Sequence, residues 1–320
     1  MSTLLELLKD GRFHSGQALG ESLGVSRSAI WKQLQLLEAE LGLVIHKVRG
    51  RGYQLASPIT LLSEAEIGQH SSSVKAWDVR IFDSIDSTNA EALRSIEQGG
   101  GSPILVLAER QTAGRGRRGR KWVSPFAENI YYSLVLRIDG GMRQLEGLSL
   151  VVGLAVMHTL REHGIPGAGL KWPNDVLVGR KKVAGILLEL VGDPADVCHV
   201  VLGVGINVNM QSAEEVDQEW TSVRLESGKT VDRNQLVARL SEVLVSYLER
   251  HKRNGFSAIQ EEWEQGHLWQ GRAVSLIAGV NKVDGVVLGI DRQGALRLSV
   301  EGEERVYSGG ELSLRLRDGS

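Results

Sequence analysis

The sequence has almost no cysteine and no long apolar stretch. Its single thiol, Cys198, excludes an internal disulfide scaffold, and no residue near it in the chain favours a nucleophilic role. We expect Cys198 to be a buried thiol without a chemical function. No segment reaches membrane-spanning length without polar interruption, and the first residues carry no cationic region ahead of a long apolar stretch. These absences predict a soluble cytoplasmic protein with no membrane partner.

The chain also lacks an excess of charge of either sign. Its formal net charge is -2, which gives no overall attraction to nucleic acid. The charge is unevenly distributed, because residues 1–60 hold seven Lys and Arg against five Asp and Glu. The N-terminal segment is therefore net basic. At 320 residues and 42% hydrophobic content, the chain is expected to form two or three domains with real cores.

The most informative segment is residues 114–121, Gly-Arg-Gly-Arg-Arg-Gly-Arg-Lys, which we call the cationic loop. Arginine offers a planar fork of donors that matches phosphate oxygens, and glycine lets the backbone approach them closely. The segment therefore predicts a phosphate clamp that becomes ordered around a bound polyanion. A solvated basic surface loop is the alternative, but such a loop has no use for the glycines.

The cationic loop also fits the pattern Gly-x-Gly-x-x-Gly of dinucleotide-binding folds. That pattern requires a strand before it and an amphipathic helix after it. The strand is expected at 104–109, but a second strand-like run, 130–136, follows the loop where the helix should begin. A dinucleotide-binding site is therefore not favoured.

The N-terminal segment has the pattern of a helix-turn-helix. Ser15 and Ser26 are placed to cap two helices, Gly24 separates them, and leucines recur at helical spacing. Residues 44–55 are predicted to form a hairpin with a cationic tip, which is a wing. A small helical bundle without a DNA role, in which Trp31 simply packs, is the alternative. The residues expected to contact DNA are Arg27, Ser28, Trp31, Lys32 and Arg51.

The middle of the chain carries polar motifs at the ends of predicted strands and helices. Residues 86–89, Asp-Ser-Thr-Asn, precede a helix and offer either a cap or a ligand contact. Residues 171–175, Lys-Trp-Pro-Asn-Asp, form a polar turn, and Lys182 begins an apolar strand, where it is suited to meet a carboxylate or a phosphate. Residues 203–209 combine glycines with Asn207, which is able to recognise a base.

These motifs, in this order, resemble those of biotin protein ligases, and the resemblance runs nearly from end to end. The basic N-terminal wing is similar to that of the bifunctional members, which also repress biotin-synthesis genes. The resemblance implies ATP-dependent formation of biotinyl-5'-AMP and transfer of biotin to a lysine of a biotin carboxyl carrier protein domain of acetyl-CoA carboxylase. It also implies Mg²⁺ as a cofactor, binding to operator DNA and ligand-promoted dimerisation. The sequence shows no dedicated metal cage.

Carried over to matching positions, the resemblance assigns roles to individual residues. It implies that Lys182, Arg117 and Asp175 are catalytic. The residues implied to bind biotin are Ser87, Thr88, Asn89, Gln111, Arg115, Arg117 and Lys182. Those implied to bind ATP or the adenylate are Arg120, Trp122, Lys171, Asn174 and Asn207. Two other functions stay open: a biotin-sensing repressor without ligase activity, and a lipoate-type ligase.

The predicted fold class is α+β. A winged helix-turn-helix domain is expected at 1–62, and a central mixed α/β catalytic domain, similar to class II synthetases and of the biotin/lipoate ligase fold, at 63–268. Residues 269–320 are expected to form an SH3-like β-barrel, because short alternating strands are separated by turns at 278–279, 293–294 and 309–310.

Overall fold

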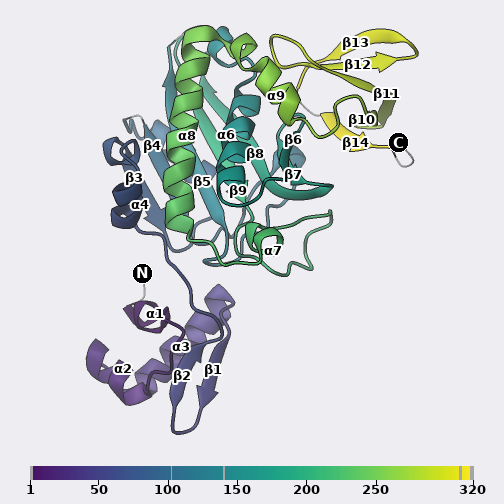
Figure 1. Cartoon of the computed structure of the whole chain (residues 1–320). Helices are drawn as coiled ribbons and strands as arrows, with labels where there is room; N and C mark the ends of the chain where they lie inside the picture. Colours follow the sequence, from purple (N-terminus) through teal and green to yellow (C-terminus); the bar gives the residue numbers. More distant parts are fainter. Residues whose placement is uncertain (1–2, 102, 140, 310–311, 318–320) are drawn as a thin grey trace.

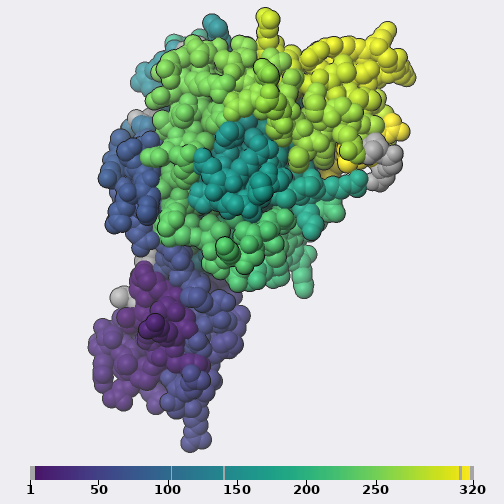
Figure 2. Space-filling view, in the orientation of Figure 1, coloured from purple at the N-terminus to yellow at the C-terminus, as the bar shows by residue number. Residues whose placement is uncertain are grey.

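The computed structural model describes residues 3–101, 103–139, 141–309 and 312–317. Three parts follow one another along the chain: a helical unit with a hairpin, a large layered α/β unit and a C-terminal antiparallel sheet (Figure 1). The first part protrudes from the other two (Figure 2). Within the described ranges, no helix has both the length and the apolar content that a membrane crossing requires.

The N-terminal part is a helix-turn-helix followed by a hairpin. Ser15 and Ser26 accept hydrogen bonds from the N–H groups three residues later, at 3.0 and 3.2 Å, and so begin two helices. Gly24 ends the first of them with a φ of 65°. Ile30 and Leu34 are fully buried in the core of this part, as their spacing predicted. The elements are α1 (Thr3–Leu8), α2 (Gly16–Leu23), α3 (Arg27–Leu41), β1 (Ile45–Val48) and β2 (Gly52–Leu55).

The central part has three layers. Its middle layer is a seven-stranded sheet of order β3-β4-β5-β9-β8-β7-β6, in which β3 and β4 are parallel and the other neighbours antiparallel. Helices α6 and α8 cover one face (Figure 1), and α5 packs on the other. The strands are β3 (Asp78–Phe82), β4 (Ile104–Ala108), β5 (Ile130–Ile138), β6 (Ala168–Lys171), β7 (Asp175–Val178), β8 (Lys181–Gly192) and β9 (Cys198–Ile206). The helices are α4 (Glu64–His70), α5 (Thr88–Glu97), α6 (Leu148–Glu162), α7 (Val223–Ser227), α8 (Arg233–Asn254) and α9 (Gln260–Gly266).

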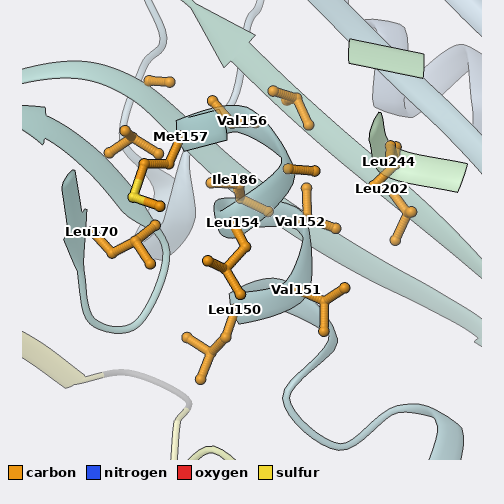
Figure 3. Close-up of a cluster of buried hydrophobic side chains, with 14 of the residues drawn as sticks. Leu150, Val151, Val152, Leu154, Val156, Met157, Leu170, Ile186, Leu202 and Leu244 are labelled. Carbon is orange, nitrogen blue, oxygen red and sulfur yellow. The ribbon is translucent and has the colours of Figure 1, made fainter. Parts of the chain in front are cut away.

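The core lies on both faces of this sheet, because central strands such as β4 are apolar and buried along their whole length. In β4, Leu105 and Leu107 pack into the large cluster beneath α6 and α8, whereas Ile104 and Val106 pack beneath α5. Each such side chain stabilises the fold by about 1.5–3 kcal/mol relative to an exposed one. Figure 3 shows part of the large cluster. There α6 contributes Leu150, Val151, Val152, Leu154, Val156 and Met157, and β6, β8, β9 and α8 contribute Leu170, Ile186, Leu202 and Leu244.

The C-terminal part is a five-stranded antiparallel sheet of order β13-β12-β11-β10-β14. The predicted turns at 278–279 and 293–294 separate strands as expected, whereas the turn at 309–310 includes a residue outside the described ones. Among the described residues no pairing joins the edge strands β13 and β14, so the sheet is open and a closed barrel is not formed. The strands are β10 (Ala273–Ala278), β11 (Asn281–Ile290), β12 (Leu296–Val300), β13 (Glu303–Tyr307) and β14 (Leu312–Leu316).

Two local expectations can be compared with the structure directly. No α-helix begins at the glycines of the cationic loop, which contains only a single 3-10 turn, Arg117–Gly119. This agrees with the rejection of a dinucleotide-binding fingerprint. The polar turn expected at 171–175 lies between two strands, because β6 ends at Lys171 and β7 begins at Asp175. Pro173 follows with no N–H to donate, so the sheet ladder stops there.

Candidate functional site

Two adjoining cavities lie where the cationic loop meets the ends of β7, β8 and β9. The larger has a volume of about 300 Å³ and the smaller about 50 Å³. They form one composite site because they share lining residues. The shared residues are Gly116, Arg117, Trp122, Asn174 and Lys182.

The smaller cavity is bounded by the N-terminus of α5. Ser87 caps that helix by accepting a hydrogen bond from the N–H of Ala90 at 3.5 Å, and it also lines the cavity. The hydroxyl of Ser133 lies 2.8 Å from Thr88 Oγ1 and 2.6 Å from Asn89 Oδ1. The cap expected at residues 86–89 is therefore confirmed, and the same segment lines the cavity, where a ligand contact stays a prediction.

Glu189, at the far end of β8, holds two residues of the smaller cavity in place. Asn89 Nδ2 donates to its carboxylate at 2.7 Å, and Arg115 approaches it at 3.2 Å. Gln111 in turn accepts a hydrogen bond from the N–H of Thr88 at 2.9 Å. The polar side chains that line this cavity are thus fixed by one another. Sequence reasoning missed Glu189, which is 100 residues from Asn89 along the chain.

The larger cavity has a charged base that we call the strand floor, made of Lys171, Asp175 and Lys182. Lys182 Nζ lies 2.7 Å from one carboxylate oxygen of Asp175, and Lys171 Nζ lies 3.3 Å from the other. All three side chains are 12 to 15% exposed. Two cations against one carboxylate leave an excess positive charge, fixed in a partly dehydrated place.

Burial shapes the protonation of the strand floor. It opposes ionisation of Asp175, but the adjacent Lys182 and Lys171 outweigh it and hold the pKa of that carboxyl below its ordinary value. Burial lowers the pKa of Lys171 below the ordinary value of a lysine, despite the nearby Asp175 carboxylate. The lowered pKa of Asp175 favours its ionised form at neutral pH, whereas burial makes the charged form of Lys171 less favourable than that of an exposed lysine.

Arg117 and Asn174 join the cationic loop to the turn between β6 and β7. Arg117 Nη1 donates to Asn174 Oδ1 at 2.7 Å, while Asn174 Nδ2 donates to the carbonyl oxygen of Ile186 at 2.9 Å. Burial lowers the pKa of Arg117, although the Asp175 carboxylate opposes this. The guanidinium is thus half-buried between the two cavities, within reach of an anion in either.

Trp122, directly after the cationic loop, forms the wall between the loop and the sheet. Its indole packs against Gly205 of β9 and leaves no room for a side chain at that position, because a Cβ there would lie 2.5 Å from the ring. Lys182 Nζ lies 5.3 Å from the ring centre. Among the described residues, the buried indole N–H of Trp122 has no hydrogen-bond partner. A donor in this position is suited to an acceptor on a ligand.

Three cations of the cationic loop, Arg118, Arg120 and Lys121, are exposed and line the larger cavity. Within the described part of the chain, the Arg118 and Arg120 side chains make no hydrogen bond or ion pair. Arg118 has a φ of 60°, a conformation that is costly for a residue with a side chain. Asn207 differs from them, since it is buried and its Nδ2 donates to the carbonyl oxygen of Thr221 at 3.0 Å.

The C-terminal sheet also reaches the site. Arg315 of β14 lines the larger cavity together with the strand floor. An adjacent cavity of about 250 Å³ is lined by Arg315, Arg180 and Trp269, and Lys171 Nζ lies 5.1 Å from the Trp269 ring centre. Sequence reasoning missed Arg315, because an arginine in an alternating strand carries no local signal of a site.

The predicted DNA-contacting residues lie far from these cavities, on α3 and the wing. All five are exposed, and the Trp31 side chain is 44% exposed, so it does not simply pack. At the tip of the wing, the guanidinium carbon of Arg51 lies 4.1 Å from the ring centre of Phe13. This contact orients the arginine without burying it.

The structure gathers every predicted ligand-binding residue around the two cavities. The predicted biotin residues, Ser87, Thr88, Asn89, Gln111, Arg115, Arg117 and Lys182, all line the smaller cavity. The larger cavity is lined by the predicted adenylate residues Arg120, Trp122, Lys171, Asn174 and Asn207, and by Asp175. The described residues include no group of three or more His, Cys, Asp and Glu side chains that could hold a metal ion.

Three family models match separate parts of the chain. One described as the biotin/lipoate A/B protein ligase family matches residues 81–207, and one described as a helix-turn-helix (HTH) domain matches residues 1–54. The third, the biotin protein ligase C terminal domain, matches residues 271–315.

Known proteins resemble the chain over nearly its whole length. The bifunctional ligase/repressor BirA of Salmonella typhimurium is 42% identical, with 98% of this chain and 97% of that protein covered. Its counterpart in Bacillus subtilis is 33% identical, covering 95% and 96%. The solved structure of biotin protein ligase from Aquifex aeolicus with biotin and ATP has a TM-score of 0.66 at 32% identity. That match covers 75% of this chain and 99% of the other.

Proposed function

The chain belongs to the biotin protein ligase family, among its bifunctional ligase and repressor members, and we propose that its two adjoining cavities hold biotin and ATP side by side. The protein is a biotin–protein ligase. It joins the carboxylate of biotin to the α-phosphate of ATP, releases pyrophosphate and then transfers biotin from biotinyl-5'-AMP to a lysine. In the second step the lysine amine attacks the acyl carbon, and AMP leaves.

Biotin occupies the smaller cavity in this proposal. Its ring system offers both hydrogen-bond donors and acceptors, and the cavity wall provides hydroxyl and amide groups whose positions are already fixed by hydrogen bonds. The biotin-binding residues would be Ser87, Thr88, Asn89, Gln111 and Arg115. The carboxylate end of biotin then points towards Arg117 and Lys182, where the two cavities meet.

The first chemical step brings two anions together, a carboxylate and a triphosphate. Positioning and charge neutralisation are the main means of lowering its barrier. Arg117 and Lys182 neutralise the carboxylate and the α-phosphate, while Asp175 holds Lys182 in place through the 2.7 Å ion pair. No proton transfer is needed for the carboxylate to attack, which agrees with a site rich in cations and without a general base.

ATP and then the adenylate occupy the larger cavity. Trp122 provides a flat wall and an indole N–H donor, and Asn207 and Asn174 provide amides at fixed positions. Arg120 and Lys171 face the phosphates from the cationic loop and the strand floor, respectively. Arg315 adds a cation from the C-terminal sheet, and we propose that an SH3-like arrangement of this sheet supports it there.

Mg²⁺ would arrive with the nucleotide. The described residues offer no cluster of carboxylates and histidines for a resident ion, and both oxygens of Asp175 face lysines. When bound, Mg²⁺ supplies charge neutralisation on the ATP phosphates, which provide most of its ligands. The residues of the chain orient those phosphates.

The cationic loop closes over the adenylate after it forms. A mixed anhydride is labile in water, so excluding solvent until an acceptor lysine arrives preserves it. Glycines in the loop allow this movement, and the exposed Arg118 and Arg120 side chains supply contacts that only a bound polyanion completes. The loop is expected to be mobile when no ligand is bound.

A single observation carries this proposal: the predicted biotin-binding side chains line one cavity, which shares Lys182 with the charged strand floor of the next. The test incubates the protein with biotin, ATP, Mg²⁺ and the biotin carboxyl carrier domain of acetyl-CoA carboxylase. Pyrophosphate release and biotin on one acceptor lysine are expected. An unmodified acceptor without pyrophosphate would leave only the sensing repressor, and preference for lipoate in competition would favour a lipoate-type ligase.

The repressor activity is assigned to residues 1–62, with the catalytic domain at 63–268 and the C-terminal domain at 269–320. Arg27, Ser28, Trp31, Lys32 and Arg51 contact operator DNA, and ligand-promoted dimerisation places two copies on a palindromic operator. Removing residues 1–60 is expected to abolish operator binding while adenylate still forms. Operator binding by the shortened protein would contradict this division.

A further inference from the structure

A fully buried ion pair lies at the base of the segment that carries the cationic loop. Arg233, the first residue of α8, and Glu109, which follows β4, are 1% and 0% exposed, and Arg233 Nη2 lies 2.6 Å from Glu109 Oε2. Neither residue lines the cavities of the site. Because both charged groups are removed from water, each needs hydrogen-bond partners within the protein. A buried charge left without a partner would lower the stability of the fold.

The partners of this pair are the two ends of the loop segment. The carbonyl oxygen of Glu109 accepts a hydrogen bond from the N–H of Ala127 at 3.0 Å, which closes residues 110–126 at their base. Arg233 Nη1 donates to the carbonyl oxygen of Asn129 at 3.0 Å, just after the segment. One ion pair therefore fixes both the entry and the exit of the cationic loop.

The same pair also holds the linker from the N-terminal domain. The N–H of Leu62 donates to Glu109 Oε1 at 2.5 Å, and Arg233 Nη2 donates to the carbonyl oxygen of Thr60 at 2.5 Å. Phe126, at the end of the loop segment, packs in the core cluster of the N-terminal part. Loop and linker thus share one set of buried contacts.

We propose that Glu109 and Arg233 are positioning residues that hold the base of the cationic loop and the interdomain linker as one unit. They touch neither biotin nor ATP, but they set the geometry from which the loop closes. This inference rests on the proposed ligase function. It predicts that breaking the pair makes the protein release biotinyl-adenylate faster. It also predicts that ligand binding then no longer changes the linker.

The experiment uses the full chain loaded with labelled biotin, ATP and Mg²⁺ and then chased with unlabelled biotin. Glu109→Gln keeps the shape of the side chain but removes its charge, and the double variant Glu109→Gln with Arg233→Met removes both charges. The matched control is Arg239→Met on the same helix, which breaks an exposed pair with Glu162 at 2.6 Å. The rate of adenylate loss, the KM for biotin, kcat and the melting temperature are measured.

Both Glu109 variants are expected to lose adenylate about two- to thirtyfold faster than the unaltered protein, the range for residues that transmit coupling without touching ligand. KM for biotin should rise more than kcat falls, and the control should match the unaltered protein. Hydrogen exchange of the Leu62 amide should slow on ligand binding in the unaltered protein but not in the double variant.

Adenylate loss at the unaltered rate in either folded Glu109 variant, even with a lowered melting temperature, would overturn the proposal. So would ligand-dependent protection of Leu62 in the double variant. If the unaltered protein forms no adenylate at all, the proposed ligase function fails instead, and the two failures are thereby distinguished.

Discussion

The cationic loop and the strand floor both present positive charge to the same cavity, yet they are built in opposite ways. Arg118, Arg120 and Lys121 are exposed on a segment with three glycines, whereas Lys171 and Lys182 are 12 and 15% exposed and share one carboxylate. The floor is preorganised, because its charges already have fixed partners. In the loop, the side chains of Arg118 and Arg120 have their contacts still to make.

This difference matches the two demands of the reaction. A barrier is lowered by charges that do not move during the step, which favours the floor. Protection of a labile intermediate requires a part that moves, which favours the loop. The comparison therefore predicts that altering the floor reduces the rate of adenylate formation, and that altering the loop mainly changes how tightly nucleotide and adenylate are held.

The largest effect is expected from Lys182→Ala, which removes the floor cation nearest the junction of the two cavities. Losing one preorganised contact to developing charge reduces the rate by about 10²–10³-fold. The rate of biotin-dependent pyrophosphate release measures this effect. Lys181→Ala, at the exposed neighbouring position, is the control and should keep the rate. Near-normal turnover of Lys182→Ala would show that the role of this lysine is misassigned.

A second change tests the contact between loop and sheet. In Gly205→Ala the new Cβ would lie 2.5 Å from the Trp122 ring, so the indole must move. A displacement of this kind lowers kcat/KM by up to about 10²-fold. Steady-state kinetics for ATP are compared with those of Gly101→Ala, where a Cβ meets nothing within 4 Å. Equal kinetics in the two variants would show that Trp122 has no role in binding or positioning ATP.

A smaller effect is expected from Arg120→Ala in the cationic loop. Its side chain is exposed, so its contact with phosphate is screened and worth at most about 1 kcal/mol, or about fivefold in the KM for ATP. The difference should shrink as salt is raised. Arg143→Ala, an exposed arginine away from the cavities, serves as control. A hundredfold loss of kcat in Arg120→Ala would show that Arg120 acts in the chemical step, as the strand floor does. That result would contradict the division of roles between loop and floor.

The smallest effect concerns pH. Burial lowers the pKa of Lys171, so the unfolded chain binds this proton more tightly than the folded one. The charged Lys171 side chain therefore destabilises the fold at neutral pH. This destabilisation disappears as the pH rises from the pKa of the folded protein towards 10.5, because the side chain then loses its proton. Over that window the free energy of unfolding should rise relative to that of Lys171→Met. A constant difference between the two proteins would contradict the lowered pKa.

Local patterns in the sequence predicted much of the fold. Ser15 and Ser26 were identified as helix caps because capping depends on residues three positions apart, and the strand expected at 104–109 is a short apolar run, which is likewise a local pattern. The ordered motifs also brought the residues of the site together. Glu189, Glu109 and Arg315 were missed because their roles depend on distant partners: Glu189 lies 74 residues from Arg115, and Glu109 lies 124 from Arg233. No local pattern reports such contacts.

The central claim is that a mobile loop closes over a fixed floor, and hydrogen exchange tests it most directly. Amides of residues 114–122 and of β9 are followed with and without biotin, ATP and Mg²⁺, while pyrophosphate release confirms that adenylate forms. The account predicts fast loop exchange that slows strongly with both ligands, beside slow exchange in β9 throughout. Loop amides that exchange equally fast after adenylate has formed would contradict it.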